Sequence, residues 1–154
     1  MYYIGIDLGG TNIAVGLVDE NGKILADISV PTHAERDYRE IVKDMAEVSK
    51  EVIEKAGVPM EEVKAVGIGC PGSIDNKNGV CTYSNNIKME NAEIAKEFKK
   101  YLDLPVNLEN DANAAALGEY EINGNGAESF VFVTLGTGVG GGGRVPVPQT
   151  DTGR

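Results

Sequence analysis

The chain has 154 residues, of which 42% are hydrophobic and 25% are charged, a composition typical of a globular domain. Its 24 acidic and 14 basic residues give a formal net charge of −10, which argues against nucleic-acid or anionic-membrane partners, because both need clustered positive charge. No apolar run reaches membrane-spanning length, no signal peptide is recognisable, and Cys70 and Cys81 are too few for a disulfide framework, so we expect a reduced, cytoplasmic protein.

The start of the chain predicts three antiparallel strands joined by tight turns. Residues 2–6 and 13–18 have the composition of strands, and residues 23–30 form the third. Residues 19–22 (Asp-Glu-Asn-Gly) are typical of a hairpin turn. Between the first two strands, residues 7–12 make another turn with two consecutive glycines at its tip.

This Gly-Gly tip has the chemistry of a phosphate-binding turn. Without a Cβ, Gly9 and Gly10 can take positive φ values and bring backbone N–H groups close to phosphate oxygens. Thr11 and Asn12 add side-chain donors, and Asp7 can hold a magnesium ion through water. Taken alone, the same residues are equally typical of a plain hairpin turn.

A long amphipathic helix is predicted for residues 38–56. Its apolar side chains recur at helical intervals on one face, and its charged side chains form a solvated face. Asp37 and Glu40 have capping-box spacing, and Gly57 ends the helix. The apolar face therefore indicates packing on a sheet. The only histidine, His33, lies in the loop before this helix without a metal-ligand neighbour.

Residues 63–69 predict a buried parallel strand that returns after this helix and runs into Cys70-Pro71-Gly72. No basic neighbour would lower the pKa of Cys70, so we expect a small buried side chain there rather than a reactive thiol. Pro71 and Gly72 are expected to shape one wall of a site and to offer a backbone donor.

A polar loop at residues 84–87 follows a short strand at residues 80–83. Asparagine side chains both donate and accept hydrogen bonds, so Asn86 suits recognition of a polyol, although loop asparagines are also common turn formers. A second helix is predicted from about Asn91 to Leu102.

The stretch around Asp111 is where we expect the chemistry. Residues 104–108 predict a short buried strand, and the alanine-rich residues 112–121 predict a helix. Asn110 and Asp111 therefore lie where a strand ends and a helix begins, the position at which open α/β sheets bind ligands. In isolation, Asp111 is more readily explained as a helix N-cap.

Residues 129–135 predict a last apolar strand, which runs into the glycine-rich residues 136–143. This is a second combination of a strand and a glycine tip, similar to the first. Neither tip fits the Walker pattern, because no Lys-Ser/Thr pair follows the glycines.

Four motifs together resemble the ROK family of bacterial sugar kinases, of the glucokinase type. They are residues 7–11, 70–72, 109–113 with 118–119, and 135–142. The resemblance implies an α/β fold of two ribonuclease-H-like domains, the actin and hexokinase ATPase architecture, closing over a cleft. The expected sheet is mixed, with three antiparallel opening strands, then parallel strands, and helices on both faces.

The resemblance also implies an ATP-dependent sugar kinase that transfers the γ-phosphoryl group of ATP to a hexose hydroxyl, with Mg²⁺ as cofactor. Asp111 would be the catalytic base that takes the proton of the attacking hydroxyl, and Asp7 would lie near the magnesium, through water. The residues that face the ATP phosphates would be Asp7, Gly9, Gly10, Thr11, Asn12, Gly136, Thr137 and Gly138. The residues that bind the sugar would be Gly72, Asn86, Asn110 and Asp111.

After Gly142 the sequence departs from the family. Family members continue with an apolar strand and a second domain, which brings a Gly-Glu-x-Gly-His stretch and in many members a zinc site. Residues 143–154 instead hold two prolines among polar residues and glycines, and they predict a disordered tail and no zinc. We therefore expect residues 1–126 to form the N-terminal kinase domain and residues 127–142 to form the first strand and phosphate loop of a truncated second domain. Such a chain would have little or no kinase activity alone.

Other functions fit the same residues. A non-catalytic sugar-binding or regulatory fragment is consistent with an incomplete cleft. The family also contains transcriptional repressors, but these carry a helix-turn-helix before the first strand, which here starts at Tyr2. Family members commonly form dimers or tetramers, so a homo-oligomer is compatible with the resemblance.

Overall fold

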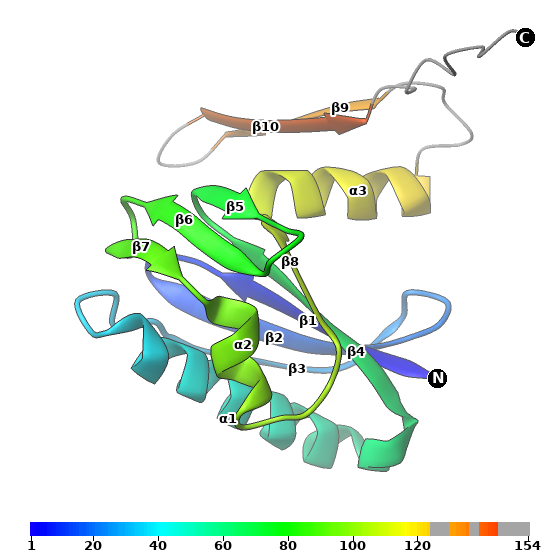
Figure 1. The fold of residues 1–154 in the computed structure, drawn as a ribbon. Helices are drawn as coiled ribbons and strands as arrows, with labels where there is room; N and C mark the ends of the chain where they lie inside the picture. The colour runs from blue at the N-terminus through cyan, green and yellow to red at the C-terminus, as the bar shows by residue number, and fades with distance from the viewer. Residues whose placement is uncertain (124–129, 136–138, 145–154) are drawn as a thin grey trace, which may run out of the picture. The chain divides into compact units, whose positions relative to one another are not determined.

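The computed structural model describes residues 1–123, 130–135 and 139–144. The chain divides into two compact units, Met1–Asp111 and Ala112–Arg154, which are described separately. The first unit is built on a five-stranded mixed sheet with the strand order β3-β2-β1-β4-β8 (Figure 1).

The sheet starts with three antiparallel strands and continues with parallel ones. Strands β1 (Tyr2–Leu8), β2 (Asn12–Asp19) and β3 (Ile24–Pro31) form an antiparallel meander. Strand β4 (Val63–Cys70) pairs in parallel with β1, and β8 (Val106–Asn110) pairs in parallel with β4. The predicted mixed sheet is confirmed. Helices on both faces stay a prediction, since the third helix continues into the second unit.

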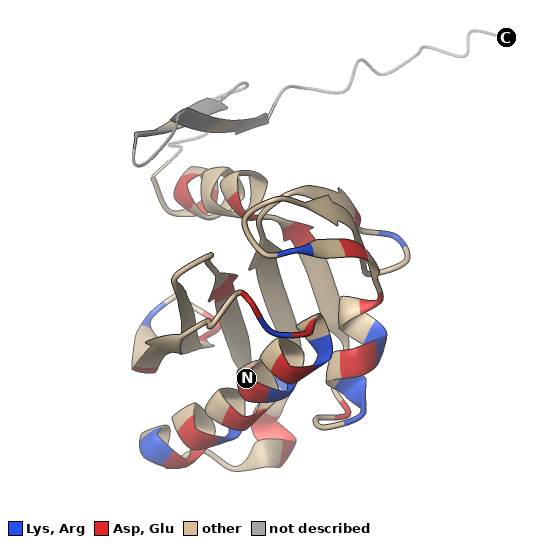
Figure 2. Cartoon of the chain, turned by 90° about the vertical axis from the view of Figure 1, so that its left-hand side faces the viewer, with Lys and Arg blue, Asp and Glu red and all other residues tan. Residues whose placement is uncertain are grey.

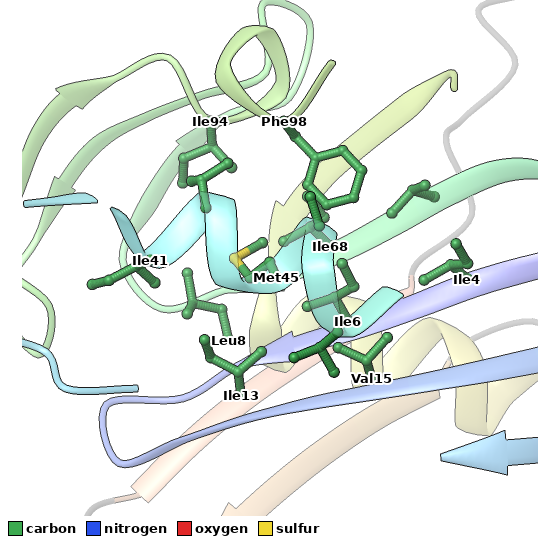
Figure 3. Close-up of a cluster of buried hydrophobic side chains, with 14 of the residues drawn as sticks. Ile4, Ile6, Leu8, Ile13, Val15, Ile41, Met45, Ile68, Ile94 and Phe98 are labelled. Atoms are coloured by element: carbon green, nitrogen blue, oxygen red, sulfur yellow. The ribbon is translucent and has the colours of Figure 1, made fainter. Parts of the chain in front are cut away.

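Helices α1 (Tyr38–Ala56) and α2 (Ile94–Lys99) pack on one face of this sheet and on each other. The alternation of the strands puts every second side chain into the interface with the helices. Figure 3 shows this cluster of buried side chains, to which both layers contribute. Its labelled members are Ile4, Ile6, Leu8, Ile13, Val15, Ile41, Met45, Ile68, Ile94 and Phe98.

Helix α1 has the predicted bounds because its end signals are local. The Asp37 carboxylate accepts a hydrogen bond from the backbone N–H of Arg39 at 2.9 Å and so caps the first turn. Gly57 ends the helix in the left-handed conformation, at a φ of 68°. The capping-box spacing predicts that the Asp37 side chain accepts from the backbone N–H of Glu40. The observed side-chain bond comes instead from Arg39, one residue earlier.

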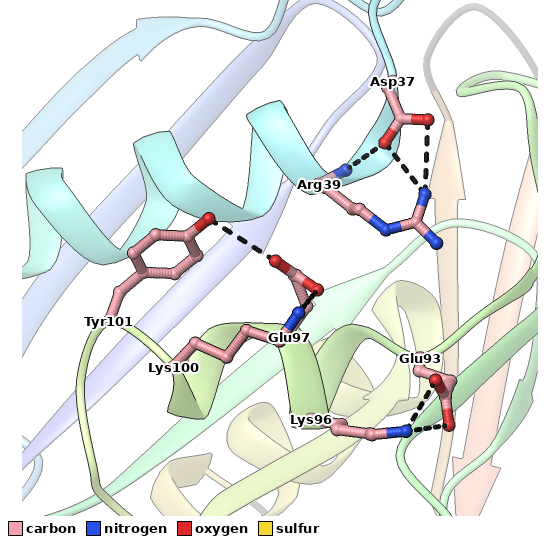
Figure 4. Close-up of polar contacts among 7 residues, drawn as sticks. All are labelled: Asp37, Arg39, Glu93, Lys96, Glu97, Lys100 and Tyr101. Carbon is pink, nitrogen blue, oxygen red and sulfur yellow. Dashed lines mark hydrogen bonds and ion pairs between the residues drawn. The ribbon is translucent and has the colours of Figure 1, made fainter.

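A polar cluster lies on α2 near the start of α1 (Figure 4). The Glu97 side chain, only 8% exposed, accepts hydrogen bonds from the Lys100 ammonium at 2.6 Å and from the Tyr101 hydroxyl at 3.4 Å. Because a buried carboxylate needs such partners, the cluster allows α2 to bury its acidic residue without a large loss of stability.

The structure also contains a small antiparallel sheet of three strands, of which the sequence predicted only the central one. It consists of β5 (Ser73–Asp75), β6 (Val80–Ser84) and β7 (Met89–Ala92), and a 3₁₀ helix (Met60–Glu62) precedes β4. The prediction that the second helix begins near Asn91 was wrong. Asn91 lies in β7 at a left-handed φ of 49°. Its neighbours Glu90 and Ala92 pair with Tyr83 and Cys81 of β6, and this pairing overrides the local helical pattern.

The second unit contains helix α3 (Asp111–Asn123) and a pair of antiparallel strands, β9 (Phe130–Leu135) and β10 (Val139–Arg144). Helix α3 begins at Asp111 as predicted. Strand β10 includes Gly143 and Arg144, so the prediction that these two residues belong to the tail was wrong. The predicted domain boundary near residue 126 lies outside the described residues.

We expect Phe98→Ala to reduce the free energy of unfolding by about 3–5 kcal/mol, because Phe98 is fully buried between α2 and the sheet and its removal leaves a cavity. Urea denaturation of the two chains measures the difference. Ile24→Ala is the matched control, since Ile24 is 62% exposed and a surface change of this kind costs within about 0.5 kcal/mol. Equal losses for the two variants would contradict the assignment of Phe98 to the core.

Candidate active site

The carboxyl ends of the parallel strands meet at one edge of the sheet. In the register of the strands, Asp7 of β1 lies beside Gly69 of β4, and Cys70 of β4 lies beside Asn110 of β8. The segments that follow these strands therefore start next to one another. This edge is where open α/β sheets bind ligands.

The Gly-Gly tip after β1 is a tight turn closed by its own backbone. The N–H of Gly9 donates to the carbonyl of Asn12 at 2.9 Å. A Cβ on Gly9 would lie 2.8 Å from that carbonyl oxygen, so the turn has no room for a side chain there. A Cβ on Gly10 would lie 3.6 Å from the Cβ of Asn86, which shows that the tip and the polar loop after β6 are neighbours.

Gly72 connects three of the predicted sugar-binding segments. Its φ is 116°, and a Cβ at this position would lie 2.2 Å from the carbonyl of Tyr83, so only glycine fits. The carbonyl of Gly72 accepts a hydrogen bond from the Asn110 side-chain amide at 3.0 Å. The structure thus brings Gly72 against the end of β6 on one side and against Asn110 on the other.

The carboxylates of Asp7 and Asp111 interact electrostatically at this edge of the sheet. Partial burial raises the pKa of Asp7 above its ordinary value, and the negative charge of Asp111 raises it further. The predicted base and the predicted magnesium-binding residue are therefore close enough to influence each other. Two nearby negative charges favour protonation of one of them or a cation in their vicinity.

Glu109 fixes the start of the Asn110–Asp111 segment. One carboxylate oxygen accepts from the backbone N–H of Asn110 at 2.8 Å, and the other accepts from the Asn76 side chain at 3.1 Å. This ties the turn after β5 to the end of β8. Glu109 belongs to the motif at residues 109–113. Its contact with Asn76 was not predicted, because nothing in the sequence links the two residues.

Thr32, which the sequence analysis did not single out, also contacts this region. Its hydroxyl donates to the carbonyl of Gly9 at 2.7 Å, and its backbone N–H donates to the carbonyl of Thr11 at 2.8 Å. A threonine directly after a strand has no distinctive sequence signal. Only the folded meander brings it next to the tip.

The two cysteines are structural, as expected for Cys70. Both are completely buried, and both are free thiols. A hydrogen bond with Cys81, together with burial, raises the pKa of the Cys70 thiol above its ordinary value. A thiol in this state is a poor nucleophile, which supports the interpretation of Cys70 as a small buried side chain.

Some predicted site features are not visible. Gly136, Thr137 and Gly138 lie outside the described residues.

Within the described part of the chain, no group of three or more His, Cys, Asp or Glu residues could hold a metal ion. No helix among the same residues is long and apolar enough to cross a membrane. Figure 2 shows basic residues interspersed among acidic ones along the helices.

In a comparison with known protein families, residues 3–145 match the ROK family. The glucokinase of Thermotoga maritima is 44% identical over 117 residues, which cover 75% of this chain and 35% of that protein. The chain thus spans about a third of the length of this curated relative.

Two solved structures are also similar. A ROK family glucokinase from Streptomyces griseus in complex with glucose and AMPPNP superimposes with a TM-score of 0.84 and 38% identity, over 94% of this chain and 45% of that one. A ROK hexokinase from Thermus thermophilus gives a TM-score of 0.81 and 37% identity, over 94% of this chain and 47% of that one. The α/β fold of the actin and hexokinase ATPases is thereby confirmed.

We expect neither cysteine to react with a thiol reagent such as DTNB while the chain is folded, because both side chains are buried and the pKa of the Cys70 thiol is raised. The measurement is the absorbance of released thionitrobenzoate in native buffer and in guanidinium chloride. Two thiols should appear only after denaturation. Rapid labelling of a thiol in native buffer would contradict the structural role.

We expect Asp7→Asn to raise stability at pH 7, by less than about 1 kcal/mol because the residue is only partly buried and water screens its charge. A raised pKa means that folding is penalised when Asp7 is ionised, so the gain should disappear as the pH falls below the ordinary pKa of 3.8. Urea denaturation from pH 7 to pH 3 measures it. Asp27→Asn, at an exposed position of β3, is the control, and identical pH profiles for the two variants would overturn the interpretation.

Proposed function

Because the chain belongs to the ROK family, we propose that it carries part of the active site of an ATP-dependent hexose kinase. The observation that supports this best is the convergence of separate segments at one sheet edge. A Cβ on Gly10 would lie 3.6 Å from the Cβ of Asn86, and the Asn110 side chain donates to the carbonyl of Gly72 at 3.0 Å. The predicted phosphate-binding and sugar-binding residues are therefore neighbours, as phosphoryl transfer requires.

The Gly-Gly tip is the proposed phosphate-binding element of this unit. Gly9, Gly10, Thr11 and Asn12 offer backbone and side-chain donors in a turn too tight for side chains at Gly9. The net charge of −10 repels ATP rather than attracting it. Local hydrogen-bond donors and a metal ion would therefore have to hold the phosphates. Gly136, Thr137 and Gly138 are proposed as the second phosphate-binding tip.

Asp7 fits a magnesium ion that arrives with ATP. It offers a hard carboxylate oxygen at the tip, and the charge of Asp111 already favours a cation nearby. Asp7 would hold such an ion, which would supply positive charge to offset the negative charge that develops on the phosphates. Since the described residues hold no cluster of three ligands, most of the coordination would come from phosphate and water.

The sugar is proposed to bind between Gly72, Asn86 and Asn110, with Asp111 as the base. The Asn110 side-chain amide donates to the carbonyl of Gly72 at 3.0 Å, which holds this side chain beside Gly72. An amide of this kind can both donate to and accept from sugar hydroxyls. The Asp111 carboxylate would take the proton of the attacking hydroxyl as its oxygen bonds to the γ-phosphorus and ADP leaves. Glucose is the first hexose to test, since the relatives from Thermotoga and Streptomyces are named glucokinases.

We expect Asp111→Asn in the full-length gene product to lower kcat by about two to four orders of magnitude, the usual contribution of a general base. The KM for glucose should change little, because an amide keeps the size and much of the hydrogen bonding of the carboxylate. A coupled assay of ADP release, with a panel of hexoses, measures both constants. Asp103→Asn, at an exposed position before β8, is the control.

The same assay separates the alternatives. Glucose-dependent ADP release that Asp111→Asn abolishes supports the kinase. Near-normal turnover in this variant would contradict the role of Asp111. Glucose binding by the wild-type protein without ADP release would instead favour a sugar-sensing regulator.

A further inference from the structure

Thr32 is a polar residue that is completely buried, and both of its hydrogen-bond donors go to the Gly-Gly tip. It follows β3 directly and has 0% exposure. Its hydroxyl donates to the carbonyl of Gly9 at 2.7 Å, and its backbone N–H donates to the carbonyl of Thr11 at 2.8 Å. Thr32 thus holds the tip at two positions, on either side of Gly10.

Thr32 is itself braced by helix α1. The Arg36 guanidinium donates to the carbonyl of Thr32 at 2.9 Å and to the Asp44 carboxylate at 2.6 Å. Asp44 lies in α1, so this chain of bonds connects the tip to the longest helix of the unit. The next residue, His33, has a φ of 51°, a conformation that is uncommon for residues other than glycine and that turns the chain from β3 toward α1.

The bond from the Thr32 hydroxyl sets the direction of one peptide group. A trans peptide points its C=O and its N–H to opposite sides, and the described chain contains no cis peptide bond. Because Thr32 holds the carbonyl of Gly9, the N–H of Gly10 in the same peptide group points away from Thr32. The N–H of Gly9, in the preceding peptide group, donates to the carbonyl of Asn12. Rotation of the Gly9–Gly10 peptide group would break the bond from the Thr32 hydroxyl.

We propose that Thr32 is a positioning residue for the phosphate of ATP, which it does not contact. Its hydroxyl fixes the Gly9–Gly10 peptide so that the N–H of Gly10 is preorganised to donate to a phosphate oxygen. This role rests on the proposed phosphate-binding function of the tip. Preorganised donors bind charge better than mobile ones, because no energy is spent on orienting them.

A matched pair of variants separates the hydroxyl from the packing of the side chain. Thr32→Val keeps the shape and removes the hydroxyl, whereas Thr32→Ser keeps the hydroxyl and removes a methyl group. In the full-length gene product, we expect Thr32→Val to raise the KM for ATP about tenfold, the equivalent of one buried hydrogen bond. The KM for glucose should stay unchanged, and Thr32→Ser should stay near the wild-type value for both substrates.

The kinetic outcomes decide between the two proposals. An active wild-type protein whose Thr32→Val variant keeps the wild-type KM for ATP would overturn the role of Thr32 and leave the kinase assignment intact. The same holds if both variants weaken ATP and glucose together, since that indicates a general loss of structure. A wild-type protein without ATP-dependent phosphorylation would contradict the proposed function and, with it, the phosphate-positioning role.

A second readout does not depend on activity. The amide resonance of Gly10 in a ¹H–¹⁵N NMR spectrum should shift in Thr32→Val and stay in place in Thr32→Ser, relative to the wild type. If Thr32→Val does not fold, Thr32→Ala takes its place, because it removes the same hydroxyl without placing a methyl group against the carbonyl of Gly9. An unchanged Gly10 resonance in a folded variant without the hydroxyl would overturn the proposal.

Discussion

The constraint on which the site depends is the parallel pairing of β1, β4 and β8. Parallel strands end at the same edge of a sheet, so Asp7, Cys70 and Asn110 bring the segments that follow them to one place. The meander of β1, β2 and β3 then leaves the Gly-Gly tip at this edge. The core of α1, α2 and the sheet stabilises this pairing, and hydrogen bonds such as the one from Asn110 to Gly72 add to the placement of the site residues.

Backbone groups rather than charged side chains determine most of the geometry of the candidate site. Gly9 and Gly72 stand where a Cβ would collide with a carbonyl oxygen, at 2.8 Å and 2.2 Å. Thr32 and Asn110 hold carbonyl groups of these two glycines through hydrogen bonds. If the tip binds ATP as we propose, directed N–H groups and a metal ion would offset the repulsion that a net charge of −10 imposes on a polyanion.

The sequence predicts best those features that local signals determine. The bounds of α1 follow from Asp37, Gly57 and one apolar face, and the strand-to-helix junction at Asp111 follows from the alanines after it. Strand β7 was missed because it is defined by its pairing with β6, a non-local contact, whereas the local pattern favours a helix near Asn91. Thr32 was missed for a similar reason, since its contacts join segments that only the folded meander brings together.

The position of a bound sugar tests the central claim most directly, namely that this sheet edge is a kinase active site. The measurement is a crystal structure of the full-length gene product with glucose and a non-hydrolysable ATP analogue. We predict a glucose hydroxyl within about 2.6–3.2 Å of the Asp111 carboxylate, the reach of a general base. The analogue's phosphates should lie against the tip of Gly9 and Gly10. Glucose bound elsewhere, with Asp111 far from every hydroxyl, would contradict the account.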